Sequence, residues 1–129
     1  MSSSRQLLGM ALFGLTLALA PAPVCSESRA ATRVRGIETL VSEARFREAA
    51  QRAPALRKAV LGMAPSPTSR RLLVRTELAA GTASLALGQE SNAKLCFLRA
   101  LRVDPELALD ATTPPKVRRT VDALRGSGG

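Results

Sequence analysis

The sequence predicts an all-α fold built from antiparallel helical hairpins, and three observations support this prediction. The chain is rich in Ala and Leu, which are strong helix formers. Aromatic residues make up only 2% of the 129 residues, with no Trp or Tyr, which disfavours the cores of β-sandwiches and barrels. Apolar side chains in 90–103 recur at the spacing of one helix face, between Gly88 and Pro105.

The N-terminal residues 1–26 have the pattern of a secretory signal peptide. Arg5 is followed by an uncharged apolar run from Leu7 to Ala20. This run is short for a membrane-spanning helix, which takes about 20 apolar residues. Pro21 and Pro23 disfavour cleavage directly before them, so we expect a cleaved signal peptide that ends at Ser26.

Two alternatives to cleavage stay open. The apolar run could be retained as an uncleaved anchor, or Cys25 could carry a lipid. Lipoprotein signals usually have Leu three residues before the cysteine and a small residue directly before it, whereas this chain has Ala22 and Val24 there. Cleavage after Ser26 removes Cys25, so the mature chain would contain no intramolecular disulfide.

Residues 31–63 are expected to be helical with a break near Ala44, because small and apolar residues recur at spacings of three, four and seven. Pro54 lies inside this stretch, and we expect it to kink or interrupt the helix. Two prolines and three hydroxyl residues in 64–69 mark the end of the region.

The strongest prediction is a helical hairpin in the middle of the chain. Its first helix starts near Pro67, where hydroxyl residues can cap free N–H groups, and stops at Gly88. Its second helix covers about 90–103 and is ended by Pro105, which disfavours a helical conformation for the residue before it. The short connection forces antiparallel packing.

A last helix is expected over 114–125. Thr113 can cap it, and Pro114 takes the first helical position, which tolerates proline. One side of this helix is apolar and contains Val117, Val121 and Leu124. Residues 126–129 are expected to form a flexible tail.

Six residues of the central hairpin follow a known repeat pattern: Gly81, Gly88, Ala93, Phe97, Ala100 and Pro105. With Val74 as the first position, they match the eighth, fifteenth, twentieth, twenty-fourth, twenty-seventh and thirty-second positions. In these residues the segment 74–107 resembles a tetratricopeptide repeat, a helix–turn–helix of about 34 residues. The resemblance implies that Gly81 and Ala93 lie where the helices cross and that Phe97 fills the groove toward the next repeat.

A weaker copy covers about 31–63, where Ala44-Arg-Phe-Arg-Glu-Ala49 resembles the turn segment of the family. With 114–125 as a capping helix, the resemblance implies one domain of about two repeats and a cap within 27–125. The strong copy departs from the family pattern at Glu77, Ala80 and Ser84, where the family favours an aromatic residue, Leu and Tyr. We therefore expect thinner packing around its first helix.

The resemblance also implies a concave groove that binds proteins and is lined by the first helix of each hairpin. The candidate partner-binding residues are Arg71, Arg75, Glu77, Leu78 and Thr82. Arg71 and Arg75 are four residues apart and so are neighbours on one helical face.

The residue types do not point to catalysis. The chain has no His, which removes the commonest general base and metal ligand. Cys96 lies on the apolar stripe of its helix and is expected to be a buried structural thiol. The carboxylates are scattered, and we expect them to be solvated or paired with nearby Arg. We predict no enzyme activity, no catalytic residue, no cofactor and no metal.

The net charge of +9 favours a solvated basic surface or an acidic partner, which could be an acidic protein segment, an anionic lipid surface or an acidic polysaccharide. Nucleic acid is not expected, because of the signal peptide and the lack of aromatic residues for base stacking. Membrane contact is expected only with an uncleaved signal or a lipidated Cys25.

We therefore expect a non-catalytic interaction module that is exported to the periplasm, the cell envelope or the exterior. The alternatives are a structural or assembly subunit of a cell-envelope complex and a signal-anchored inner-membrane protein. Homo-oligomerisation also stays open.

Overall fold

The computed structural model describes residues 22–127, with side chains from Ser26 onward. This part of the chain contains α-helices and no strand, which confirms the predicted all-α fold of helical hairpins. The helices are α2 (Ala22–Ser42), α3 (Phe46–Leu61), α4 (Pro67–Ala86), α5 (Glu90–Val103) and α6 (Pro115–Ser127).

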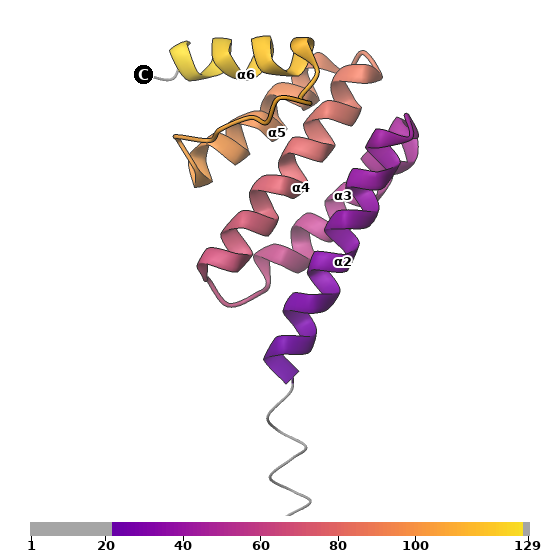
Figure 1. Cartoon of the computed structure of the whole chain (residues 1–129), viewed down its shortest axis with the longest axis vertical. Helices are drawn as coiled ribbons and strands as arrows, with labels where there is room; N and C mark the ends of the chain where they lie inside the picture. The colour runs from indigo at the N-terminus through magenta and orange to yellow at the C-terminus, as the bar shows by residue number, and fades with distance from the viewer. Residues whose placement is uncertain (1–21, 128–129) are drawn as a thin grey trace, which may run out of the picture.

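α4 is the central helix of the fold. It packs against α2, α3 and α5, and α6 packs against α5 (Figure 1). Buried residues occur on most sides of α4, whereas the other helices bury a single face. The core is consequently a layer on each side of α4 rather than one central cluster. One cluster joins α2, α3 and α4, and two smaller clusters join α4 and α5 to α6 and to the segment 104–114.

The first hairpin turns at Ala44, close to the predicted break. Ala44 has a φ of 60°, in the left-handed region that a non-glycine residue rarely adopts. The N–H of Arg45 donates to the carbonyl of Leu40, and the N–H of Ala44 donates to that of Val41, so the last carbonyls of α2 are satisfied.

The prediction that Pro54 interrupts its helix was wrong. α3 continues through Pro54 from Phe46 to Leu61. Pro54 is exposed, while Ala53 and Leu56 on either side of it are buried. Burial of this apolar face holds the helix together although proline cannot donate the usual backbone hydrogen bond.

The second hairpin begins with a capping box. The Ser66 Oγ accepts from the N–H of Ser69, and the N–H of Ser66 donates to the Ser69 Oγ. α4 ends one turn before Gln89, whose N–H donates to the carbonyl of Ser84. Gly88 has a φ of +79°, which its lack of a Cβ permits at this tight turn.

α4 and α5 cross at Gly81. A Cβ built on Gly81 would lie 2.5 Å from Cε1 of Phe97, so only glycine fits against this ring. Phe97 is fully buried and also packs with Val117 and Val121 of α6. The structure thus places Phe97 between the second hairpin and the helix that follows it. Ala93 and Ala100 are fully buried on the same helix, and Pro105 follows its end.

The segment 104–114 joins α5 to α6 and is held by two arginines of α6. Nη2 of Arg118 donates to the carbonyl of Asp110 at 2.7 Å, and Nη2 of Arg125 donates to the carbonyl of Leu107. In Figure 1 the segment crosses in front of α5 before it enters α6. Leu107 is buried and anchors the segment to the core.

The C-terminal helix differs in its bounds from the prediction. It begins at Pro115, one residue later than expected, and it includes residues 126 and 127 of the expected tail. Most of the predicted signal peptide lies outside the described residues, but α2 already begins at Ala22. The predicted cleavage point after Ser26 therefore falls within the first two turns of α2.

Candidate functional site

The candidate site is a groove along one face of α4. Arg71, Arg75, Leu78 and Thr82 follow one another at intervals of four, three and four residues, so they share one helical face. This face lies between α2 and the segment 104–114, and we call it the α4 groove.

The N-terminal half of the α4 groove is a basic recess with apolar walls. It has a volume of about 580 Å³ and is lined by Arg71 and Arg75 together with Val74, Leu78 and Leu107. Arg71 is exposed, and no carboxylate of the described residues lies within ion-pair distance of it. Its guanidinium is therefore free to meet an anionic group at the mouth of this recess.

The C-terminal half of the groove is a second recess, of about 530 Å³. Arg75 and Leu78 line both recesses, so the two adjoin along α4. Thr82 lines the second recess, and its hydroxyl donates to the carbonyl of Leu78 at 2.7 Å. Leu109, which belongs to the segment held by α6, forms part of the opposite wall.

Arg75 is fixed at the junction of the two recesses. Its Nη2 and Nε donate to the Glu38 carboxylate of α2 at 2.5 and 3.1 Å. These hydrogen bonds raise the pKa of Arg75 above its ordinary value despite partial burial. Arg75 thus joins the first hairpin to α4 and is already paired with a carboxylate. Arg71 has no such partner in the described part of the chain.

Glu77 does not belong to the groove, although the sequence reasoning placed it among the partner-binding residues. Its side chain is only 1% exposed. Nε and Nη2 of Arg57, on α3, both donate to Oε1 of Glu77, at 2.8 and 2.6 Å. Nε of Arg99, on α5, lies 3.8 Å from Oε2. Glu77 is therefore an internal link between three helices. It pairs with arginines, as expected of the carboxylates, but it does so inside the core rather than in the groove.

The helical face of Glu77 explains its burial and could have revealed it. Residues 77, 80, 81 and 84 recur at helical spacing, and Ala80, Gly81 and Ser84 are all small. A carboxylate on such a face points into a helix crossing rather than into water. Its partner could not be found in the same way, because Arg57 lies on another helix, 20 residues earlier.

Small residues also leave a shallow recess on this side of α4. It has a volume of about 240 Å³ and is lined by Ala80, Ser84, Cys96 and the exposed Leu95. The recess lies where the sequence lacks the Leu and Tyr that the tetratricopeptide pattern favours, so packing here is thin. Its lining residues face away from the α4 groove.

Cys96 is a buried free thiol at the edge of this internal cluster. Burial raises the pKa of the thiol, and the negative charge of Glu77 raises it further, against the opposing effect of Arg57 and Arg99. A raised pKa keeps the sulfur in its protonated, weakly nucleophilic form at neutral pH. The contact of 3.7 Å from Nη2 of Arg57 to its Sγ is a weak hydrogen bond.

Within residues 22–127, no group of three or more metal-ligating side chains gathers, and no helix is long and apolar enough to cross a membrane. The arrangement of the α4 groove suits recognition of an anionic and partly apolar surface. Comparison with protein-family models, with curated proteins and with solved structures gave no match to this chain.

Proposed function

We propose that the chain is an exported, non-catalytic interaction module that binds an acidic, partly apolar segment of another protein in the α4 groove. The observation that carries this proposal is the free guanidinium of Arg71 above the apolar walls formed by Val74, Leu78 and Leu107. Charge at the rim and apolar area below are the two features that protein-binding surfaces combine.

The ion pairs formed by the carboxylates support this choice. Glu38, Glu48 and Glu77 all contact arginines within the described structure. Five of the ten acidic side chains form ion pairs with arginines, and the net charge of +9 leaves an excess of cations. An acidic partner would be attracted by this field and guided to the groove.

The resemblance to tetratricopeptide repeats fits the same proposal. Modules of that kind present the first helix of each hairpin on a concave side, and here α4 is the first helix of the second hairpin. In this proposal α2 and α3 form the first repeat, α4 and α5 form the second, and α6 is the cap. The predicted signal peptide would deliver the module to the periplasm or cell envelope.

A second candidate function is assembly into a larger envelope complex or an oligomer. The observation that favours it is Leu95, which is 52% exposed beside the shallow recess on the far side of α4. An apolar side chain from a neighbouring subunit could fill that recess. Leu95→Asp would then dissociate the assembly and leave binding at the α4 groove unchanged, which separates the two candidates.

The α4 groove is tested by Arg71→Glu, with Arg47→Glu as its matched control. Both arginines are exposed, and both changes alter the net charge equally, but Arg47 lies near the start of α3, away from the groove. We leave Arg75 unchanged, because a carboxylate there would face Glu38.

The partner is first captured from an envelope extract with wild-type protein and then purified. Reversal of a rim charge should weaken its binding by about tenfold, with a slower association rate. Arg47→Glu should bind as the wild type does. Equal affinity of the Arg71→Glu variant at low salt would contradict the proposal.

A further inference from the structure

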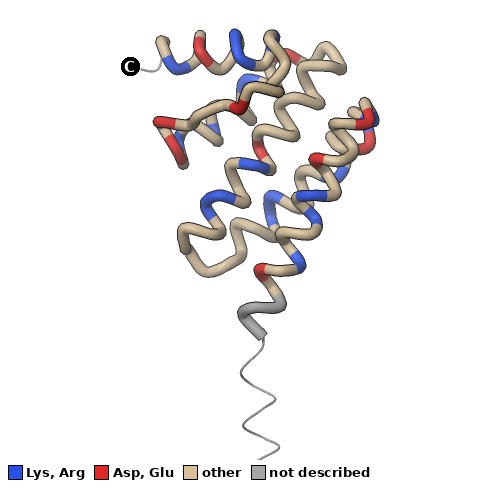
Figure 2. The backbone as a smooth tube through the Cα atoms, in the orientation of Figure 1, with Lys and Arg blue, Asp and Glu red and all other residues tan. Residues whose placement is uncertain are grey.

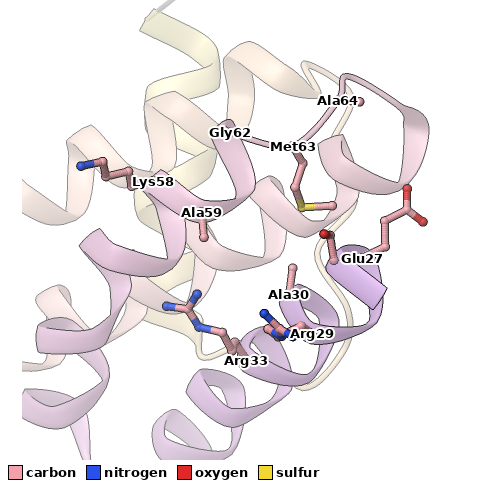
Figure 3. A pocket seen from close by; sticks show the side chains of 10 residues that line it. Glu27, Arg29, Ala30, Arg33, Lys58, Ala59, Gly62, Met63 and Ala64 are labelled. Atoms are coloured by element: carbon pink, nitrogen blue, oxygen red, sulfur yellow. The ribbon is translucent and has the colours of Figure 1, made fainter. Parts of the chain in front are cut away.

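A second basic surface lies at the end of the molecule where α2 begins. Arg29 and Arg33 of α2 and Lys58 of α3 surround a recess of about 550 Å³, with Met63 and Ala30 between them (Figure 3). Arg29 and Arg33 are four residues apart, so their side chains are neighbours on α2. The cations of two helices are thus brought to one end of the fold.

The charges of this recess are not neutralised within the described structure. None of Arg29, Arg33 and Lys58 has a carboxylate of residues 26–127 within ion-pair distance. The nearby Glu27 carboxylate points away from both guanidinium groups (Figure 3). Figure 2 shows further Lys and Arg on α2, α3 and α4 toward the same end.

An exposed apolar tip lies next to these cations. Leu61, at the end of α3, is 62% exposed and is three residues from Lys58, on the adjacent part of the helix surface. Ala64 and Pro65 of the following loop are exposed, and Met63 is half-buried against the core. Exposed apolar groups beside cations are typical of surfaces that lie at a membrane interface.

In the sequence, an apolar segment precedes the helix that starts at this end. The uncharged run Leu7–Ala20 comes directly before α2 in the sequence, and Arg29 follows it by nine residues. Whether that run is retained as an anchor or only guides the chain through the membrane, the start of α2 is the part of the fold next to it in sequence. Basic residues beside an apolar segment are attracted to anionic lipid headgroups.

We propose that this end of the protein docks on anionic lipid headgroups. Arg29, Arg33 and Lys58 contact the phosphate groups, and Leu61 and Pro65 enter the headgroup layer. We call this set the basic end surface. Its recess shares no lining residue with the two recesses of the α4 groove. The proposal does not depend on the proposed protein-binding function.

The experiment uses the full chain in two kinds of vesicle, one of phosphatidylcholine alone and one with about a third phosphatidylglycerol. The apolar N-terminal run can attach the chain to both, so attachment alone is not informative. The readout is hydrogen–deuterium exchange of the peptides that cover 27–35 and 58–66. We expect exchange there to slow by about tenfold with the anionic vesicles only, and to recover at 1 M salt, where charges are screened beyond about 3 Å.

The variant is Arg29→Glu with Arg33→Glu, and its matched control is Arg47→Glu with Arg119→Glu. All four residues are exposed, and the control places the same change of charge on the opposite end of α3 and on α6. Circular dichroism checks that both variants are folded. We expect the slower exchange to be lost in the first double variant and kept in the second.

Three results would overturn the proposal. Equal slowing with both kinds of vesicle would assign the effect to the apolar run alone. Slowing that persists in Arg29→Glu with Arg33→Glu would show that the cations do not contact the lipid. Slowing by a soluble polyglutamate peptide, with none by anionic vesicles, would identify an acidic protein as the ligand of this surface.

Discussion

Gly81 is the position where the fold tolerates the least change. A Cβ there would lie 2.5 Å from the Phe97 ring, which is fully buried and cannot retreat into solvent. We predict that Gly81→Ala destabilises the protein by about 1–3 kcal/mol, the usual cost of overpacking. Urea unfolding followed by circular dichroism measures the change.

Gly36 is the matched control for this prediction. It also lies within a helix, α2, but nothing lies within 4 Å of the position that a Cβ on it would take. Gly36→Ala should be neutral or stabilising by up to about 1 kcal/mol, because alanine is the better helix former. When it is added to Gly81→Ala, Phe97→Leu should recover part of the lost stability, because the smaller side chain makes room for the Cβ. Equal stability of Gly81→Ala and the wild type would show that the helices do not cross at this residue.

The buried ion pair of Glu77 and Arg57 gives a second prediction. Arg57→Met leaves the Glu77 carboxylate inside the core with only Arg99, 3.8 Å away, to compensate it. Removal of one partner of a buried pair costs about 3 kcal/mol or more. Replacement of both partners, by Glu77→Leu with Arg57→Met, should restore most of the loss because no uncompensated charge remains.

Urea unfolding of the single and double variants measures this coupling. The expected order of stability places the double variant well above Arg57→Met. If the two were equally unstable, the loss would come from missing packing of the Arg57 side chain rather than from its charge.

At the scale of single elements, the turn between α2 and α3 contains avoidable strain. Ala44 adopts a φ of 60°, which costs an L-residue with a Cβ roughly 1–2 kcal/mol. We predict that Ala44→Gly raises the free energy of unfolding by about 0.5–1 kcal/mol, after the greater freedom of glycine in the unfolded chain is deducted. The thermal midpoint should rise by a few degrees.

Ala64→Gly serves as the comparison. Ala64 is also exposed in a loop between helices, but it has no positive φ. Glycine there adds freedom to the unfolded chain without relief of strain, so this variant should be slightly less stable than the wild type. A gain in both variants would mean that strain at Ala44 is not the cause.

The sequence predicts most helix bounds well, because each is marked locally. Gly88 and Pro105 end their helices where expected, and hydroxyl residues begin α4. The helix is not interrupted at Pro54, because burial of the flanking residues overrides the local preference of proline. Glu77 was misjudged because its environment depends on Arg57 and Arg99, which lie on other helices and cannot be assigned to it from spacing alone.

The α4 groove was predicted only in part, because its walls come from other parts of the chain. Arg71 and Leu78 share a face of α4 as helical spacing requires. The walls come from α2 and from the segment 104–114, and periodicity says nothing about where an irregular segment lies. The Glu38 partner of Arg75 is likewise set by how α2 packs on α4.

At the scale of the whole molecule, one prediction concerns the N-terminal residue of the exported protein. We predict that exported protein starts at Glu27, because the prolines before Val24 disfavour earlier cleavage. Cleavage there would remove the first residues of α2, and among the α2 residues whose side chains are described, the buried ones begin at Ala30. N-terminal sequencing of protein from the cell envelope measures this directly, and a lipid-modified Cys25 or a full-length chain would contradict it.

The two arginines that α6 extends to the segment 104–114 have a thermodynamic consequence for the groove. Arg118 and Arg125 hold the carbonyls of Asp110 and Leu107, and that segment is a wall of both recesses. Local opening of α6 would therefore release the wall, and occupancy of the groove would favour the closed form. Because such linkage is reciprocal, a partner bound against the segment 104–114 should also slow the fraying of α6.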